Sequence, residues 1–304
     1  MKTILPQLRS RMRGLAPICW LLLSGALAGP VLAGEGTATA VDGTRLHYVD
    51  NGRASTQPTL VFVPGWGMDH TIWDAQLAAF DATHRVVAMD PRSQGASQQT
   101  GSGNTPEGRA GDIEAVLAAQ GLDAVVLIGW SQGVQDVAAY VDRYGTGRVA
   151  GLVLVDAAVS NGAAAVAADP QAAQQLLQRM AVYAAHPREY LRGMMGAIFV
   201  KPLAPERLQQ RVDIALRTPV STGVAMLVAD LYGMDRSAAL KKFDRPTLIV
   251  ASAGSGELEA QRAAAAQIPG AVLEVVNDAG HGVFVDQPEV FNAALRRFLL
   301  KAKR

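Results

Sequence analysis

The feature that most constrains the fold is an alternation of short apolar runs with longer amphipathic stretches. The apolar runs are rich in branched residues, as expected of strands buried on both faces, and they begin at Thr59, Arg85, Asp123, Val149, Pro246 and Ala271. Helical patterns lie between them, at about 71–80, 106–120, 133–144, 257–267 and 288–301. Strands that alternate with helices predict an α/β fold, with a mostly parallel central sheet and helices on both faces.

Two stretches depart from this alternation. Residues 37–52, TATAVDGTRLHYVDNG, alternate around Asp42-Gly43 and predict an antiparallel hairpin at the edge of the sheet. Residues 157–242 contain helix-forming runs without a clear strand, and they are too many for a loop. We therefore expect a helical cap over 157–242, inserted between the two parts of a core, 34–156 and 243–304.

The N-terminal segment, residues 1–33, has the pattern of a secretory signal peptide. It carries basic residues without any acidic one, and then an apolar stretch that closes on Ala33. Pro17, Ser24 and Pro30 interrupt that stretch, so it is a poor spanning helix, although an uncleaved anchor is the alternative. The pattern predicts a periplasmic or secreted protein, with no stable membrane insertion after cleavage.

Charge and cysteine content narrow the function. Without residues 1–33, 24 of the 28 Lys and Arg residues stand against 27 Asp and Glu, a net charge of −3. No basic patch suggests a nucleic-acid partner. Cys19 is the only cysteine and lies within residues 1–33, so the mature chain has no disulfide, thiolate ligand or cysteine nucleophile. The histidines show no metal-ligand spacing either, so we expect a small-molecule substrate and neither a metal nor another cofactor.

Residues 127–133, LIGWSQG, place a serine where a strand turns into a helix. The apolar run reaches Gly129, and helical spacing follows Gly133. So abrupt a turn strains the backbone of its central residue and requires small neighbours. Ser131 is therefore a candidate nucleophile in a G-x-S-x-G context; the alternative is a serine that only caps the helix.

A serine hydroxyl needs a base to take its proton. Among the five histidines, His281 stands in NDAGHGVFVDQP, after the last predicted strand and before the terminal helix. A loop at that place lies at the same edge of the sheet as Ser131, so His281 is the candidate base. We interpret the other histidines as surface or packing residues, and Asp90 and Arg92 as organisers of their loop.

Five segments occur in an order that resembles α/β-hydrolase-fold enzymes over nearly all of residues 36–302: VFVPGWGMDHTIW, RVVAMDPRSQGAS, GWSQG, GLVLVDAA and DAGHGVFVDQPEVF. The first two are similar to the serine-hydrolase branch that contains non-haem haloperoxidases, perhydrolases and small esterases. The resemblance implies Ser131 as nucleophile and His281 as general base and then acid.

The resemblance also implies an oxyanion hole made of the backbone N–H groups of Trp66 and Gln132. The family usually has His-Gly in the first of these loops, where this chain has Pro64-Gly65. Because the donor is a main-chain group, the departure does not remove it.

The third catalytic group is where the resemblance weakens. The aspartate that most members carry would fall on Ser255. Two carboxylates are candidates to replace it, and only one is expected to serve. Asp156 ends the strand that precedes the cap, where haloalkane dehalogenases carry their acid, and Glu257 lies two residues beyond Ser255. Asp156 is the first choice. The alternative role of Asp156 is to cap the helix that follows it, and that of Glu257 is to stand in the first turn of a helix, where the helix dipole favours a glutamate.

Together these features predict an exported serine hydrolase that cleaves an ester-like bond through an acyl-Ser131 intermediate. Its substrate should be small to medium and rather apolar. One alternative is cofactor-free perhydrolase or haloperoxidase chemistry on the same triad. The other is a non-catalytic binding protein with the hydrolase fold, which the missing aspartate at Ser255 favours.

Overall fold

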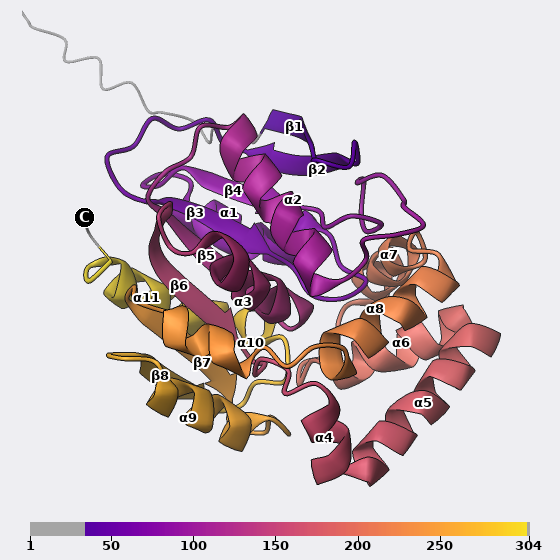
Figure 1. The fold of residues 1–304 in the computed structure, drawn as a ribbon. Helices are drawn as coiled ribbons and strands as arrows, with labels where there is room; N and C mark the ends of the chain where they lie inside the picture. Colours follow the sequence, from indigo (N-terminus) through magenta and orange to yellow (C-terminus); the bar gives the residue numbers. More distant parts are fainter. Residues whose placement is uncertain (1–33, 303–304) are drawn as a thin grey trace, which may run out of the picture.

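The computed structural model describes residues 34–302, which form one eight-stranded sheet with helices on both faces (Figure 1). The predicted signal peptide, residues 1–33, lies outside the described residues. The strands are β1 (Gly34–Thr39), β2 (Arg45–Asp50), β3 (Thr59–Val63), β4 (Val86–Met89), β5 (Val125–Trp130), β6 (Val149–Val155), β7 (Thr247–Ser252) and β8 (Val272–Val276).

The order of the strands in the sheet is β1-β2-β4-β3-β5-β6-β7-β8. The hairpin β1–β2 pairs antiparallel, with Gly43 in its turn at φ 85°, and β2 pairs antiparallel with β4. All pairs from β4 to β8 are parallel. The predicted parallel sheet and its antiparallel edge hairpin are therefore confirmed.

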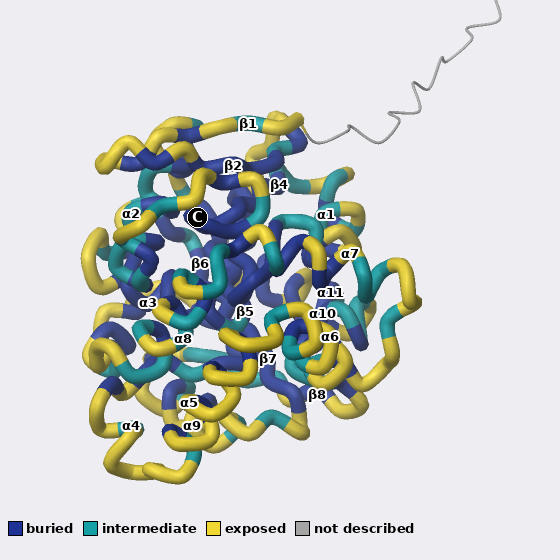
Figure 2. Tube along the Cα trace, turned by 90° about the vertical axis from the view of Figure 1, so that its right-hand side faces the viewer, coloured by how far each residue is buried: buried dark blue, intermediate teal, exposed yellow. Residues whose placement is uncertain are grey.

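Helices cover both faces of the sheet because successive strand residues point to opposite sides. Leu60 and Phe62 belong to one apolar cluster, and Val61 and Val63 to the other, and all four are buried. Figure 2 shows the strands in the middle of the sheet as the buried centre of the molecule, whereas β1 at one edge is largely exposed. The helices of the core are η1 (His70–Trp73), α1 (Asp74–Phe80), α2 (Pro106–Ala119), α3 (Gln132–Tyr144), η2 (Ser237–Lys242), α9 (Leu258–Gln267), α10 (Val283–Asp286) and α11 (Pro288–Leu299).

A helical segment, residues 163–232, separates β6 from β7, where we expect the cap. It contains α4 (Ala163–Ala168), α5 (Pro170–Ala185), α6 (Pro187–Ala197), α7 (Pro205–Ala215) and α8 (Val220–Tyr232). These helices gather beside the core (Figure 1). Within residues 34–302, no single helix is long and apolar enough to cross a membrane. Only α7 and α8 taken together have the required length and hydropathy, and the two helices are bent by 87° relative to each other.

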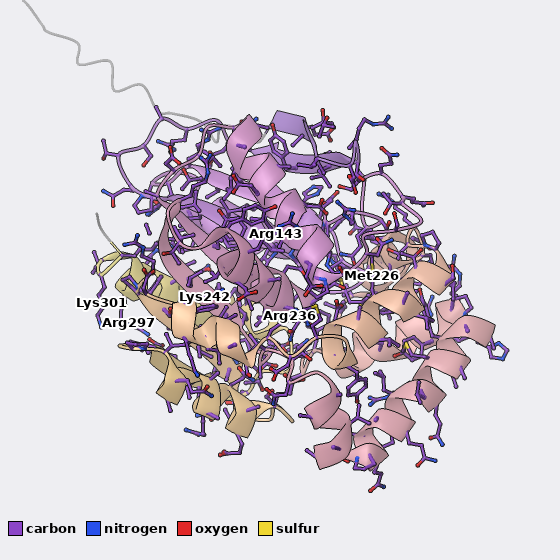
Figure 3. The ribbon with its side chains drawn as sticks, viewed as in Figure 1. Arg143, Met226, Arg236, Lys242, Arg297 and Lys301 are labelled. Carbon is purple, nitrogen blue, oxygen red and sulfur yellow. The ribbon has the colours of Figure 1, made fainter. Side chains whose placement is uncertain are left out.

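Buried ion pairs attach the helical segment to the core. Arg109 on α2 is fully buried, and its Nε lies 2.9 Å from Asp136 on α3. Its Nη2 also donates to Asp230 on α8, so one guanidinium joins two core helices to the segment. A second link follows α8, where Arg236 donates to Glu107 on α2 (2.5 Å), and Figure 3 labels that arginine.

Candidate active site

Ser131 occupies the turn between β5 and α3. Its backbone has φ 56° and ψ −118°, a conformation that costs free energy for a residue other than glycine. In the described structure its side chain makes no capping hydrogen bond with α3, so the interpretation as a helix cap is wrong. The turn instead leaves the hydroxyl free at the carboxyl end of the sheet.

The glycines around Ser131 are required by close backbone contacts. A Cβ on Gly133 would lie 2.5 Å from the carbonyl oxygen of Val63, and one on Gly129 would overlap the carbonyl oxygen of Gly133. A Cβ on Gly65 would lie 3.0 Å from Cβ of Ser131. The loop after β3 therefore packs its main chain directly against the serine.

Asp156 follows β6 and points its carboxylate at His281. Its Oδ2 lies 2.9 Å from Nδ1 of His281, and its Oδ1 accepts the backbone N–H of Ser252 at 2.8 Å. The residue is 2% exposed. A buried carboxylate with both oxygens engaged holds the imidazole in one orientation and favours a proton on Nδ1.

The structure does not bring Glu257 to His281. Its Oε2 accepts the backbone N–H of Ala158 at 2.9 Å, which ties the start of α9 to the chain after β6. Ser255 has no carboxylate, but its Oγ accepts a hydrogen bond from Nε2 of Gln261 at 3.2 Å. The same amide nitrogen lies 3.4 Å from Oδ1 of Asp156. Ser255, which stands where most members of the family have the aspartate, thus helps to hold Gln261 against Asp156.

The loop that carries His281, between β8 and α10, is fixed by hydrogen bonds from other elements. Nε1 of Trp130 donates to the carbonyl oxygen of His281 at 2.9 Å, and Oγ of Ser252 donates to that of Ala279 at 2.6 Å. Asp286, also buried, accepts the N–H of Gly280 at 2.8 Å. Sequence reasoning missed these supporting residues, although Trp130 stands inside the G-x-S-x-G motif itself.

Trp66 and Gln132 lie at the two places where oxyanion donors are expected. Gln132 is the first residue of α3, and Trp66 follows Gly65 in the loop against Ser131. Within residues 34–302, neither backbone N–H has a hydrogen-bond acceptor. The Trp66 indole is tied to the helical segment, because its Nε1 donates to the carbonyl oxygen of Gly223 on α8 at 2.9 Å.

A cavity of about 250 Å³ opens over these groups, between the core and the helical segment. Ser131 and His281 both line it, and most of the remaining wall is apolar, including Met194, Leu227 and Leu231. Among the described residues no hydrogen bond joins the Ser131 hydroxyl to His281; such bonds commonly tighten only when substrate binds. Two larger hollows, of about 330 and 580 Å³, are lined by other residues, remote from Ser131.

A second cluster of titratable groups comes from three elements: His47 lies in β2, His70 begins η1, and Asp90 follows β4. Nδ1 of His47 is 2.9 Å from Oδ2 of Asp90, and Nδ1 of His70 is 2.8 Å from Oδ1. Their ligand atoms are near enough to one another for a metal ion, which the linear spacing of the histidines did not indicate. Asp90 also accepts the N–H groups of His70 and Ala96, so hydrogen bonds account for both its oxygens and it organises its loop as expected.

Opposing effects set the pKa values in this cluster. Burial alone would lower the pKa of His70, but the hydrogen bond to Asp90 and its charge outweigh burial and raise it. Burial alone would raise the pKa of Asp90, and the two imidazoles outweigh that effect and hold it well below its ordinary value. The Asp90 carboxylate is therefore ionised throughout the neutral range.

Comparison with known proteins shows the family of this chain. The model of the alpha/beta hydrolase family matches residues 60–294, and the chain belongs to that family. It is 43% identical over 120 residues to a non-heme haloperoxidase from Rhodococcus erythropolis, covering 39% of this chain and 43% of the relative. It is 29% identical over 283 residues to a non-heme chloroperoxidase from Kitasatospora aureofaciens, covering 86% and 98%.

The similarity to the haloperoxidase from Rhodococcus erythropolis is confined to part of this chain. The chain spans less than half the length of that relative. Among solved structures, an esterase from Exiguobacterium antarcticum superposes with a TM-score of 0.78, covering 88% of this chain and all of the other at 22% identity. At that identity the likeness concerns the fold alone.

Proposed function

We propose that this chain is a serine hydrolase that cleaves an ester-like bond of a small to medium, rather apolar substrate. The observation that carries the proposal is the pairing of Asp156 with His281 beside the strained Ser131, at the floor of one apolar cavity. Family membership supports the same reaction class.

The proposed mechanism follows from which atom of each group is occupied. Because Nδ1 of His281 faces Asp156, Nε2 is left to accept the proton of Ser131. The Ser131 oxygen then attacks the carbonyl carbon of the substrate, and Asp156 stabilises the imidazolium that forms. The backbone N–H groups of Trp66 and Gln132 would stabilise the oxyanion, each contributing about 3 kcal/mol to lowering the barrier.

Breakdown of this intermediate releases the alcohol, which takes its proton from His281 and leaves an acyl-Ser131 enzyme. Water activated by His281 then hydrolyses the acyl group and restores the hydroxyl. A serine at the turn argues against the two relatives that need a carboxylate nucleophile there, haloalkane dehalogenases and epoxide hydrolases.

A fluorophosphonate probe tests the proposal, because it labels only an activated serine. We expect labelling of the folded chain that disappears in Ser131→Ala. The matched control is Ser221→Ala, on the exposed surface of α8, which should label like the parent chain. Absence of labelling in folded parent protein would favour a non-catalytic binding protein, whose main support, the missing aspartate at Ser255, is weakened by the position of Asp156.

Perhydrolase or haloperoxidase chemistry is the second candidate, and the similarity to the haloperoxidase from Rhodococcus erythropolis favours it. Acetate-dependent bromination in the presence of hydrogen peroxide would distinguish it from simple ester hydrolysis.

Export to the periplasm or the medium belongs to the same proposal and rests on the sequence of residues 1–33. Cell fractionation tests it: the chain should leave the cytoplasm, with an N-terminus at Gly34, and removal of residues 1–33 should retain it inside.

A further inference from the structure

Arg179 is a cation in a wall that is otherwise almost entirely apolar. The cavity over Ser131 is lined by residues such as Leu176, Met194 and Ile198 together with Arg179. Among the described residues of this lining, Arg179 is the only Lys, Arg, Asp or Glu. An apolar pocket with one cation selects a ligand that has an apolar body and one anionic group.

The position of Arg179 on α5 places it at the mouth of the cavity. Leu176, Met180 and Tyr183 form the buried face of this helix. Arg179 stands three residues after Leu176 and next to Met180, at the border of that face, and its side chain is largely exposed although it contributes to the lining.

The guanidinium of Arg179 has unused donors. Its Nε donates to the carbonyl oxygen of Gln175 in its own helix at 3.4 Å, and it forms no ion pair within the described part of the chain. Arginines on neighbouring helices do form ion pairs: Arg188 pairs with Asp213 at 2.8 Å, and Arg207 pairs with Asp74 at 3.0 Å. The charge at the mouth of the cavity is thus available to a ligand.

We propose that Arg179 binds a carboxylate of the substrate, so that this enzyme prefers esters or lactones whose acyl chain ends in a carboxylate. The inference rests on the proposed hydrolysis at Ser131 and adds the substrate class. The planar guanidinium matches a carboxylate through two parallel N–H···O bonds. One guanidinium neutralises one negative charge, whereas a phosphate monoester carries nearly two at neutral pH. The apolar wall between Arg179 and Ser131 would hold the chain that separates the carboxylate from the scissile carbonyl.

Two esters of equal chain length test the proposal: p-nitrophenyl hydrogen glutarate, which is anionic, and p-nitrophenyl methyl glutarate, which is neutral. The parent chain should hydrolyse the anionic ester with the higher kcat/KM. Charge-assisted hydrogen bonds contribute enough that Arg179→Gln should lower kcat/KM for the anionic ester about tenfold or more, chiefly by raising KM. The neutral ester should lose far less, because it offers no charge to the guanidinium, and Arg179→Lys should restore part of the preference.

The matched control is Arg143→Gln, which removes the same charge from the exposed end of α3 (Figure 3). It should change neither ester. A parent chain without preference for the anionic ester, or an Arg179→Gln variant that loses both activities equally, would overturn the proposal.

Binding to the inactive chain separates this proposal from hydrolysis itself. Calorimetry on Ser131→Ala should show tighter binding of monomethyl glutarate than of dimethyl glutarate, and the difference should vanish in Ser131→Ala/Arg179→Gln. Charge-selective binding without turnover of either ester would refute the hydrolase and retain the carboxylate site. Turnover of both esters with equal binding of the two glutarates would support the hydrolase and refute the carboxylate site.

Discussion

Nδ1 of His281 and Oδ2 of Asp156 lie 2.9 Å apart although 125 residues separate them in the chain. The contact joins the end of β6 to the loop after β8, across the intervening β7. The carboxylate of Glu257, the other candidate acid, instead accepts a hydrogen bond from the backbone N–H of Ala158. The two carboxylates are therefore distinguished by their contacts, and substitution should distinguish their roles.

Asp156→Asn should lower kcat for a p-nitrophenyl ester about 10⁴-fold, because an amide neither fixes the imidazole nor stabilises its charged form. Glu257→Gln should stay within about twofold of the parent chain, since its amide oxygen still accepts the Ala158 N–H. The two variants are compared by steady-state kinetics on folded protein. A large loss in Glu257→Gln beside an active Asp156→Asn would reverse the assignment.

The turn that carries Ser131 should not tolerate a methyl group at Gly133. A Cβ there would lie 2.5 Å from the carbonyl oxygen of Val63, a backbone atom in the centre of the sheet that cannot move aside. Gly133→Ala should reduce the free energy of unfolding by about 1–3 kcal/mol, as overpacking does, and should abolish fluorophosphonate labelling.

The control for this prediction is Gly193→Ala. Gly193 is exposed in α6, and a Cβ there would meet no atom within 4 Å. The substitution should therefore raise the free energy of unfolding by about 0.5–1 kcal/mol, because alanine loses less conformational freedom in a helix. Urea unfolding of both variants measures the contrast; equal stability of the two would show that the turn has room for a side chain.

The sequence was sufficient for the sheet because strands buried on both faces leave continuous apolar runs, and β3 to β8 begin within a few residues of those runs. It was also sufficient for the place of Ser131, since the turn requires residues without a Cβ at 129 and 133, and the sequence has glycine at both.

The choice between Asp156 and Glu257 could not be made from the sequence. Both follow strands that end at the same edge, and the direction of each side chain depends on tertiary contacts. Asp156 has φ 48°, and the N–H of Ser252 fixes its Oδ1. The cluster of His47, His70 and Asp90 was missed for a similar reason, because its members come from three separate elements and show no local spacing.

Arg109 should matter more for stability than either aspartate that it binds. Arg109→Met leaves Asp136 and Asp230 buried without a cation, and we expect a loss of about 3–5 kcal/mol. Asp230→Asn keeps the Arg109–Asp136 pair and removes one of two neighbouring carboxyl groups whose pKa values burial raises, so its loss should be smaller. Urea unfolding gives both values. A greater loss in Asp230→Asn would mean that Asp136 alone does not compensate the charge of the buried Arg109, and that the contact with α8 contributes most of the stability.

The contribution of His70 to stability should depend on pH with a definite sign. Although burial opposes it, the Asp90 carboxylate raises the pKa of His70 above its ordinary value of 6.5, so the folded state binds a proton more tightly than the unfolded state. The resulting stabilisation is fully present below pH 6.5 and is lost as the pH rises through the raised pKa. The difference in unfolding free energy between the parent chain and His70→Gln should therefore be larger at pH 5.5 than at pH 8.5.

His84 is a control whose pH dependence should have the opposite sign, because burial lowers its pKa and no carboxylate of the described residues counteracts the burial. Its neutral form is favoured in the folded state, so protonation of the unfolded chain costs stability at acidic pH. The difference between the parent chain and His84→Gln should be smaller at pH 5.5 than at pH 8.5. Chemical unfolding of the three chains at both pH values checks the pair of signs. If the two variants shift in the same direction, the Asp90 carboxylate does not govern the titration of His70.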